Sequence, residues 1–150
     1  MALRPIVKEG EEILLKKSRP VEAFDDRLGQ LLDDMAETMY AADGVGLAAP
    51  QVGILRRVCV IDIGEGLLEL VNPVVTAQSG VQETPEGCLS SPGKCGITRR
   101  PQKVTVTYQD RTGAARTITG EDLLAKALCH EIDHLNGILY AAHVIRWQEA

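Results

Sequence analysis

Aromatic side chains are scarce in this chain, where they make up 3% of 150 residues with a single Phe and a single Trp. A core built around stacked rings is therefore excluded, and the interior has to be assembled from aliphatic side chains, which bring the hydrophobic content to 45%. Apolar runs are also short, so we expect neither a signal peptide nor a membrane span. A cytoplasmic location is the expectation that follows.

Positively charged residues are also fewer than negatively charged ones. The chain has 16 Lys and Arg residues and 21 Asp and Glu residues, which gives a net charge of −5. This balance predicts no specific nucleic-acid partner and no membrane partner. The four cysteines could form two disulfides, but free thiols or metal ligation are expected in a reducing compartment. The length, without repeats or linkers, predicts a single domain over residues 1–150.

Hydrophobic periodicity predicts an α+β fold. Asp25 or Asp26 can cap a helix that runs to about Ala42, with an apolar stripe at spacings of three and four residues. Compact β-branched or alternating runs predict the strands that follow, and residues 91–96 read as a turn. Strands are expected at residues 57–63, 67–75, 103–109 and 115–119.

A second helix is expected near the end of the chain. We predict its start at Thr119 or Gly120, because the acidic Glu121 and Asp122 would then lie near the positive N-terminal end of the helix. Asn136-Gly137 is typical of a helix end.

This second helix contains His130-Glu131-Ile132-Asp133-His134, which reads H-E-x-x-H. Positions i and i+4 lie on one face of a helix, so both imidazoles can reach one metal ion. Glu131 beside them can take a proton from water on that ion. The motif predicts a metal-dependent hydrolase that still needs a third ligand.

The third ligand decides the class of hydrolase. A metzincin would carry His where this chain has Tyr140, and only His143 and Glu149 follow as conventional ligands. Cys88, within Glu86-Gly87-Cys88-Leu89-Ser90, is the better candidate. Three protein ligands with one position open for water is the general form of a catalytic site.

A third block, Gly44-Val45-Gly46-Leu47-Ala48-Ala49-Pro50-Gln51, combines small residues with an amide that can stabilise an oxyanion. With the three blocks in this order, the chain resembles the peptide deformylases, which carry G-x-G-x-A-A-x-Q, E-G-C-x-S and H-E-x-x-H. The resemblance covers almost the whole chain. It implies a central helix bearing H-E-x-x-H among small antiparallel or mixed sheets, plus an N-terminal helix.

The resemblance also implies an activity, namely removal of the N-formyl group from the formyl-methionine of nascent polypeptides with release of formate. Cys88, His130 and His134 would bind one divalent ion, with Fe²⁺ favoured and Zn²⁺, Ni²⁺ or Co²⁺ possible. Metal-bound water would attack the formyl carbon, with Glu131 as general base and acid.

Further site residues follow from the same resemblance. Gln51 and the backbone N–H of Leu89 match the oxyanion donors, and Gly46 matches a backbone contact to the substrate. The residues expected to line the methionine pocket are Val45, Thr84, Glu86, Leu123, Ala127 and His130.

Two departures from the family pattern stand out. Cys95 occupies a position where many members have Arg. The sequence also ends soon after Trp147, whereas some members continue into a long helix that docks on the ribosome. A ribosome partner is therefore expected to need another route.

Rival interpretations remain open at this point. Cys95 or Cys129 could close the shell of a structural zinc site, and Cys95 is the better placed of the two because Cys129 points about 100° away from its neighbour on a helix. Alternatively, the chain could bind formyl peptides without turning them over.

Overall fold

The computed structural model describes residues 2–148 and contains two α-helices, α1 (Asp26–Ala41) and α2 (Leu123–Leu135). The strands are β1 (Gly46–Ala48), β2 (Val58–Ile61), β3 (Leu68–Ser79), β4 (Gln82–Glu86), β5 (Cys95–Arg100), β6 (Lys103–Gln109), β7 (Ala115–Glu121) and β8 (Val144–Gln148). Short 3-10 helices are η1 (Glu12–Leu15), η2 (Ala49–Val52) and η3 (Tyr140–His143).

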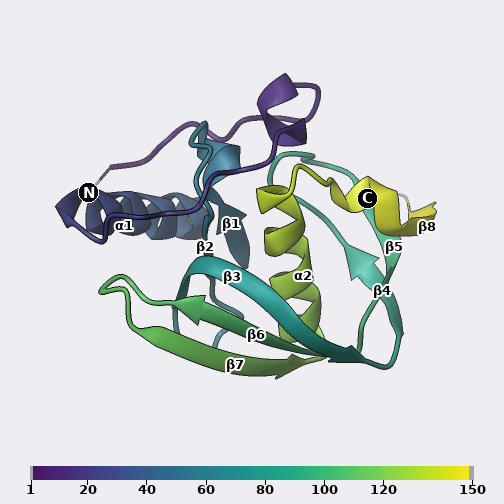
Figure 1. Ribbon diagram of the computed structural model, residues 1–150. Helices are drawn as coiled ribbons and strands as arrows, with labels where there is room; N and C mark the ends of the chain where they lie inside the picture. Colours follow the sequence, from purple (N-terminus) through teal and green to yellow (C-terminus); the bar gives the residue numbers. More distant parts are fainter. Residues whose placement is uncertain (1, 149–150) are drawn as a thin grey trace.

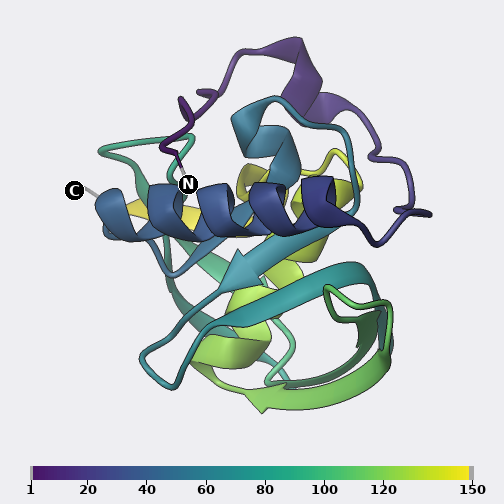
Figure 2. The ribbon, with the colours of Figure 1, turned by 90° about the vertical axis from the view of Figure 1, so that its left-hand side faces the viewer.

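Helix α2 lies at the centre of the molecule (Figure 1). One sheet has five strands in the order β1-β2-β3-β6-β7, the other has the order β4-β5-β8, and the described pairs of these strands are antiparallel. Helix α1 and the three-stranded sheet lie on opposite sides of α2, and Figure 2 shows α1 crossing in front. The predicted α+β class is confirmed. Within residues 2–148, no helix combines the length and apolar character that crossing a bilayer requires.

Helix α1 begins where the sequence predicts. The side chain of Asp25 accepts a hydrogen bond from the backbone N–H of Leu28 at 3.1 Å, which satisfies one of the free donors of the first turn. Leu32, Met35 and Met39 on its apolar stripe are fully buried and form a core with residues of β1 and β2. Full burial of each such side chain contributes about 1.5–3 kcal/mol.

The predicted start of α2 is wrong. Thr119 and Glu121 pair with Thr105 and Lys103 of β6, so β7 continues to Glu121 and the helix begins only at Leu123. Asp122 makes the change of direction with a φ of 54°, and it provides no side-chain cap. Pairing with a neighbouring strand outweighed the local preference of acidic residues for a helix start.

The predicted end of α2 is confirmed. Gly137 adopts a φ of 74°, which favours glycine, and the N–H of Ile138 reaches back to the carbonyl of Asp133 at 2.9 Å. A Cβ at Gly137 would lie 2.5 Å from the carbonyl oxygen of Leu15, so close packing against η1 also requires glycine.

Strand β4 lies outside the predicted strands, and so do three further short strands, β1, β5 and β8. The turn expected over residues 91–96 ends at Lys94, and β5 begins at Cys95. Strand β8 is mostly exposed and carries no alternating apolar pattern, while β1 lies within the block of small residues that begins at Gly44. All three pair with partners distant in the chain, so no local pattern marks them. Strand β3 is irregular at Asn72, which has a φ of 51°, and its register against β6 shifts between Val71 and Val74.

Candidate metal centre

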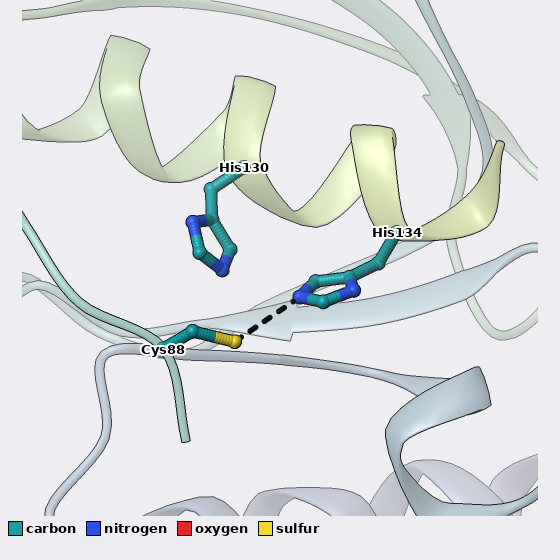
Figure 3. Close-up of side chains that lie close together, drawn as sticks. All are labelled: Cys88, His130 and His134. Atoms are coloured by element: carbon teal, nitrogen blue, oxygen red, sulfur yellow. Dashed lines mark hydrogen bonds between the residues drawn. The ribbon is translucent and has the colours of Figure 1, made fainter. Parts of the chain in front are cut away.

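Cys88, His130 and His134 form a compact cluster. Helix α2 places the two histidines one turn apart, and Cys88 follows the end of β4 (Figure 3). One ligand atom of each residue lies within 4.8 Å of the others, and the Cys88 Sγ is 3.3 Å from the Nε2 of His134. The structure therefore brings together the three predicted ligands from two segments of the chain.

The donor set fits a divalent transition metal. One thiolate with two imidazoles suits Zn²⁺ or Fe²⁺ and is poor for Mg²⁺ or Ca²⁺. The Nδ1 of His130 lies 2.5 Å from the Oε2 of Glu86, which leaves Nε2 as the nitrogen available to a metal. Beside the cluster, the Oε1 of Glu131 is buried and has no hydrogen-bond partner among the described residues. Such an orphaned oxygen is costly, and a water on a bound ion would satisfy it.

Behind His130, the carboxylate of Glu86 is held by a buried ion pair. Arg100 donates to both of its oxygens, at 3.1 Å from Nε and 2.7 Å from Nη2, and Thr98 donates to Oε1 at 2.9 Å. Burial alone would raise the pKa of Glu86, but hydrogen bonds from His130 and Arg100 outweigh it and lower the pKa to about 2. Glu86 is therefore a fixed anion against the back of the ligand ring.

Sequence reasoning missed Arg100 and Thr98. Arg100 also reaches Asp133 of α2, with its Nη1 at 2.7 Å from Oδ2, and its side chain is 2% exposed. In the sequence, Arg99-Arg100 looks like a surface patch, and only the β4–β5 pairing turns Arg100 inward.

Glu131 is buried next to the cluster. Burial raises its pKa to about 7, against the opposing charge of His130. Gly46 faces it from β1, where a Cβ would lie 2.4 Å from the Glu131 Oε2. Only glycine leaves room for this carboxylate.

Gln51 reaches the cluster from η2, and its side chain is held at both ends. Its Oε1 accepts from the N–H of Ala48 at 3.0 Å, and its Nε2 donates to the Ser90 Oγ at 3.1 Å. The same Nε2 lies 3.5 Å from the Cys88 Sγ. The amide nitrogen of Gln51 therefore donates to Ser90 and lies next to the Cys88 sulfur of the cluster.

These groups open onto one cavity of about 430 Å³. Thr84 is not among the lining residues, and its hydroxyl accepts from the Lys126 Nζ at 3.0 Å. His134 is fully buried and is also not among the residues that line the cavity. Lys126 lines the cavity without having been predicted. The predicted residues on the wall are Val45, Gly46, Gln51, Glu86, Cys88, Leu89, Leu123, Ala127, His130 and Glu131.

The other candidate ligands lie elsewhere. The Cys95 Sγ is 3.5 Å from the Oε1 of Gln148, and the His143 Nε2 is 3.0 Å from Asp133. Cys129 is a half-buried thiol whose pKa is raised to about 11 by burial. Within residues 2–148 the cluster contains three ligands, so the four-ligand shell of a structural zinc site is not assembled. Glu149 lies outside the described residues.

Comparison with known proteins gives one consistent answer. A family model described as polypeptide deformylase matches residues 3–150. A protein named peptide deformylase from Caldanaerobacter subterraneus subsp. tengcongensis is 59% identical over 98% of this chain and 92% of its own length. A second one, from Acetivibrio thermocellus, is 58% identical over 98% and 86%.

Solved structures agree. The crystal structure of peptide deformylase from Thermotoga maritima matches with a TM-score of 0.93 at 38% identity, covering 95% of this chain and 97% of that one. A peptide deformylase from Synechococcus elongatus, solved in complex with actinonin, matches with a TM-score of 0.90 at 40% identity, covering 93% and 77%.

Proposed function

The chain belongs to the peptide deformylase family and is a hydrolase that removes the N-formyl group from nascent polypeptides, and we propose that Cys88, His130 and His134 hold its metal ion beside Glu131 as the catalytic base. One observation supports the roles proposed for these four residues. The thiol, the buried carboxylate and the first imidazole line the same cavity, and the second imidazole lies directly behind them.

The donor set suits a single divalent ion, and we propose Fe²⁺ as the natural metal, with Zn²⁺, Ni²⁺ and Co²⁺ able to occupy the site. When bound, such an ion lowers the pKa of its water toward ~7 and polarises the formyl carbonyl. The remaining chemistry belongs to side chains and backbone groups of this chain.

Glu131 moves the proton. Its carboxylate accepts a proton from the attacking water as the new C–O bond forms, and then delivers it to the nitrogen as the C–N bond breaks. Formate and a free α-amine leave. The unpartnered, buried Oε1 and the space that Gly46 leaves for this side chain support the role.

Gln51 and Leu89 stabilise the negative charge that develops on the formyl oxygen. The Gln51 Nε2 is only weakly engaged by the Cys88 sulfur at 3.5 Å, so one amide hydrogen can turn to a stronger acceptor. Leu89 directly follows the ligand cysteine on the cavity wall, where its N–H can serve as a second donor. A donor of this kind contributes roughly 3–4 kcal/mol to the transition state.

The first side chain of the substrate occupies the apolar part of the cavity. Val45 and Leu123 are large apolar residues that stay 46% and 43% exposed, and both lie on its wall with Ala127. A volume of about 430 Å³ suits a methionine side chain with part of the peptide. Gly46 offers its backbone beside this position. We propose the cytoplasm as the location, because formylated nascent chains are made there.

Release of formate from formyl-Met-Ala-Ser tests the proposal. Protein purified without oxygen and loaded with Fe²⁺ is expected to turn over this peptide and to leave acetyl-Met-Ala-Ser intact. Gln51→Leu is expected to lower kcat by roughly 100–1,000-fold with metal content unchanged. Absence of formate from the metal-loaded protein would overturn the proposed roles.

A further inference from the structure

One face of α2 forms a wall of the substrate cavity. Leu123, Lys126, Ala127 and His130 all line the cavity, and their spacings of three, four and seven residues place them on the same side of the helix. Lys126 is the positively charged residue of this face, and it lies between Leu123 and Ala127 of the proposed methionine pocket along the helix.

The ammonium of Lys126 is half-buried and has two protein acceptors. It donates to the hydroxyl of Thr84 at 3.0 Å and to the carbonyl of Pro85 at 2.6 Å, both of which are neutral acceptors. An ammonium has three N–H groups, so the third is open to solvent or to a ligand in the cavity. Within residues 2–148, Lys126 forms no ion pair, because the nearby Glu86 is occupied by Arg100 and His130.

The second lysine of the cavity differs in this respect. Lys94 lies at the turn after Cys88, forms an ion pair with Glu9, and keeps 56% of its side chain exposed. Burial lowers the pKa of Lys126, while the negative charge of Glu86 acts in the opposite direction without forming an ion pair. Lys126 therefore gains from any strong acceptor that a substrate brings close to it.

We propose that Lys126 extends the substrate range of this enzyme to peptides that begin with formyl-methionine sulfoxide, by donating its remaining N–H to the sulfoxide oxygen. This inference rests on the proposed function. A thioether is a weak acceptor and gains little from the ammonium, whereas oxidation makes the same side chain polar. Burying that oxygen against Val45, Leu123 and Ala127 alone would be costly. The spare N–H removes this penalty.

The test compares three peptides, in which Ala-Ser follows formyl-methionine, formyl-methionine sulfoxide or formyl-norleucine. Norleucine has the shape of methionine but no acceptor. For wild type, we expect kcat/KM with the sulfoxide to be at least comparable to that with norleucine. Lys126→Met keeps the length and apolar stem of the side chain, and is expected to lower the sulfoxide-to-norleucine ratio roughly tenfold or more, mainly through KM.

Lys94→Met is the matched control, since it removes a positive charge from the same cavity but not the donor near the methionine pocket. Its ratio is expected to match wild type. Lys126→Gln, which restores a neutral donor, is expected to recover part of the ratio, and it serves as the second variant if Lys126→Met does not fold.

The outcomes separate the two claims. If wild type turns over formyl-methionine but its sulfoxide-to-norleucine ratio equals that of Lys126→Met, the role of Lys126 is wrong and the deformylase activity stands. If wild type with bound metal releases no formate from any of the three peptides, the proposed function fails, and this inference fails with it.

Discussion

The Oε2 of Glu86 lies 2.5 Å from the Nδ1 of His130, on the side of the ring away from the metal cluster. Resemblance to the family places Glu86 in the methionine pocket, yet most of its hydrogen-bonding capacity is directed at His130 and Arg100. A carboxylate in this position fixes the orientation of the ring and makes Nε2 a better ligand. Glu86 therefore links the two strands β4 and β5 to the proposed metal site.

Glu86→Gln is expected to weaken metal binding. The variant keeps the shape of the side chain but replaces the charged acceptor at His130, and losses of this kind typically cost roughly 10–100-fold in affinity. Competition with a chromophoric chelator measures the change. Glu83→Gln is the matched control, because Glu83 pairs with the exposed Arg99 on the same two strands. Equal affinities for the two variants would contradict the role of Glu86.

Arg100→Met is expected to destabilise the fold by roughly 3–5 kcal/mol, because it leaves the buried Glu86 and the partly buried Asp133 without their cation. Arg99→Met breaks an ion pair between side chains that are 62% and 41% exposed, and should cost about 0–1 kcal/mol. Urea unfolding of the metal-free proteins measures both values. A loss below about 1 kcal/mol for Arg100→Met would show that its ion pairs are not stabilising.

Removing the metal is expected to lower the unfolding temperature of wild type, since a ligand that binds only the folded state stabilises it by about 2.7 kcal/mol at one hundred times its Kd. Cys88→Ser should lose most of this difference between metal-loaded and chelator-treated protein. Cys95→Ser should retain it, because Cys95 lies outside the cluster and contacts Gln148. Scanning calorimetry with and without chelator decides between these results. If Cys95→Ser also lost this difference in unfolding temperature, Cys95 would have to be a metal ligand.

Gly46→Ala is expected to abolish most activity while leaving the protein folded. The new methyl group would lie 2.4 Å from the Glu131 Oε2, and this buried carboxylate has little room to move away. Gly29→Ala offers the contrast, because its Cβ would meet only Arg111 at 3.5 Å and alanine favours the helix by about 0.5–1 kcal/mol. Formate release and thermal unfolding measured on both variants test the pair. Full activity in Gly46→Ala would show that Glu131 does not depend on this space.

The proximity of Cys88, His130 and His134 could be predicted from the sequence because it depends largely on local spacing. His130 and His134 need only a helix to face one ion, and α1 follows from its cap and its Leu and Met stripe. Cys88 and Gln51 enter through their resemblance to family motifs. Each of these features depends on residue types close together in the chain, and the structure brings all of them to one place.

Other features depend on pairing between distant segments. Nothing near Arg100 distinguishes it from its exposed neighbour Arg99, because the register of β4 against β5 decides which of them turns inward. The start of α2 was misplaced for a similar reason, since the β6 partner of Thr119 lies fourteen residues earlier in the chain. Lys126 was overlooked because a lysine on a helix usually faces solvent, and only the cavity reveals its position.

Glu131 is proposed to move the proton in a metal-dependent deformylase, and Glu131→Gln is the variant that tests this role. Metal content and kcat for formyl-Met-Ala-Ser would be measured on the same Fe²⁺-loaded samples of wild type and variant. We expect one metal ion per chain in both proteins and a fall in kcat of at least roughly 100-fold in the variant. A variant that keeps its metal and turns over the peptide at the wild-type rate would contradict the account.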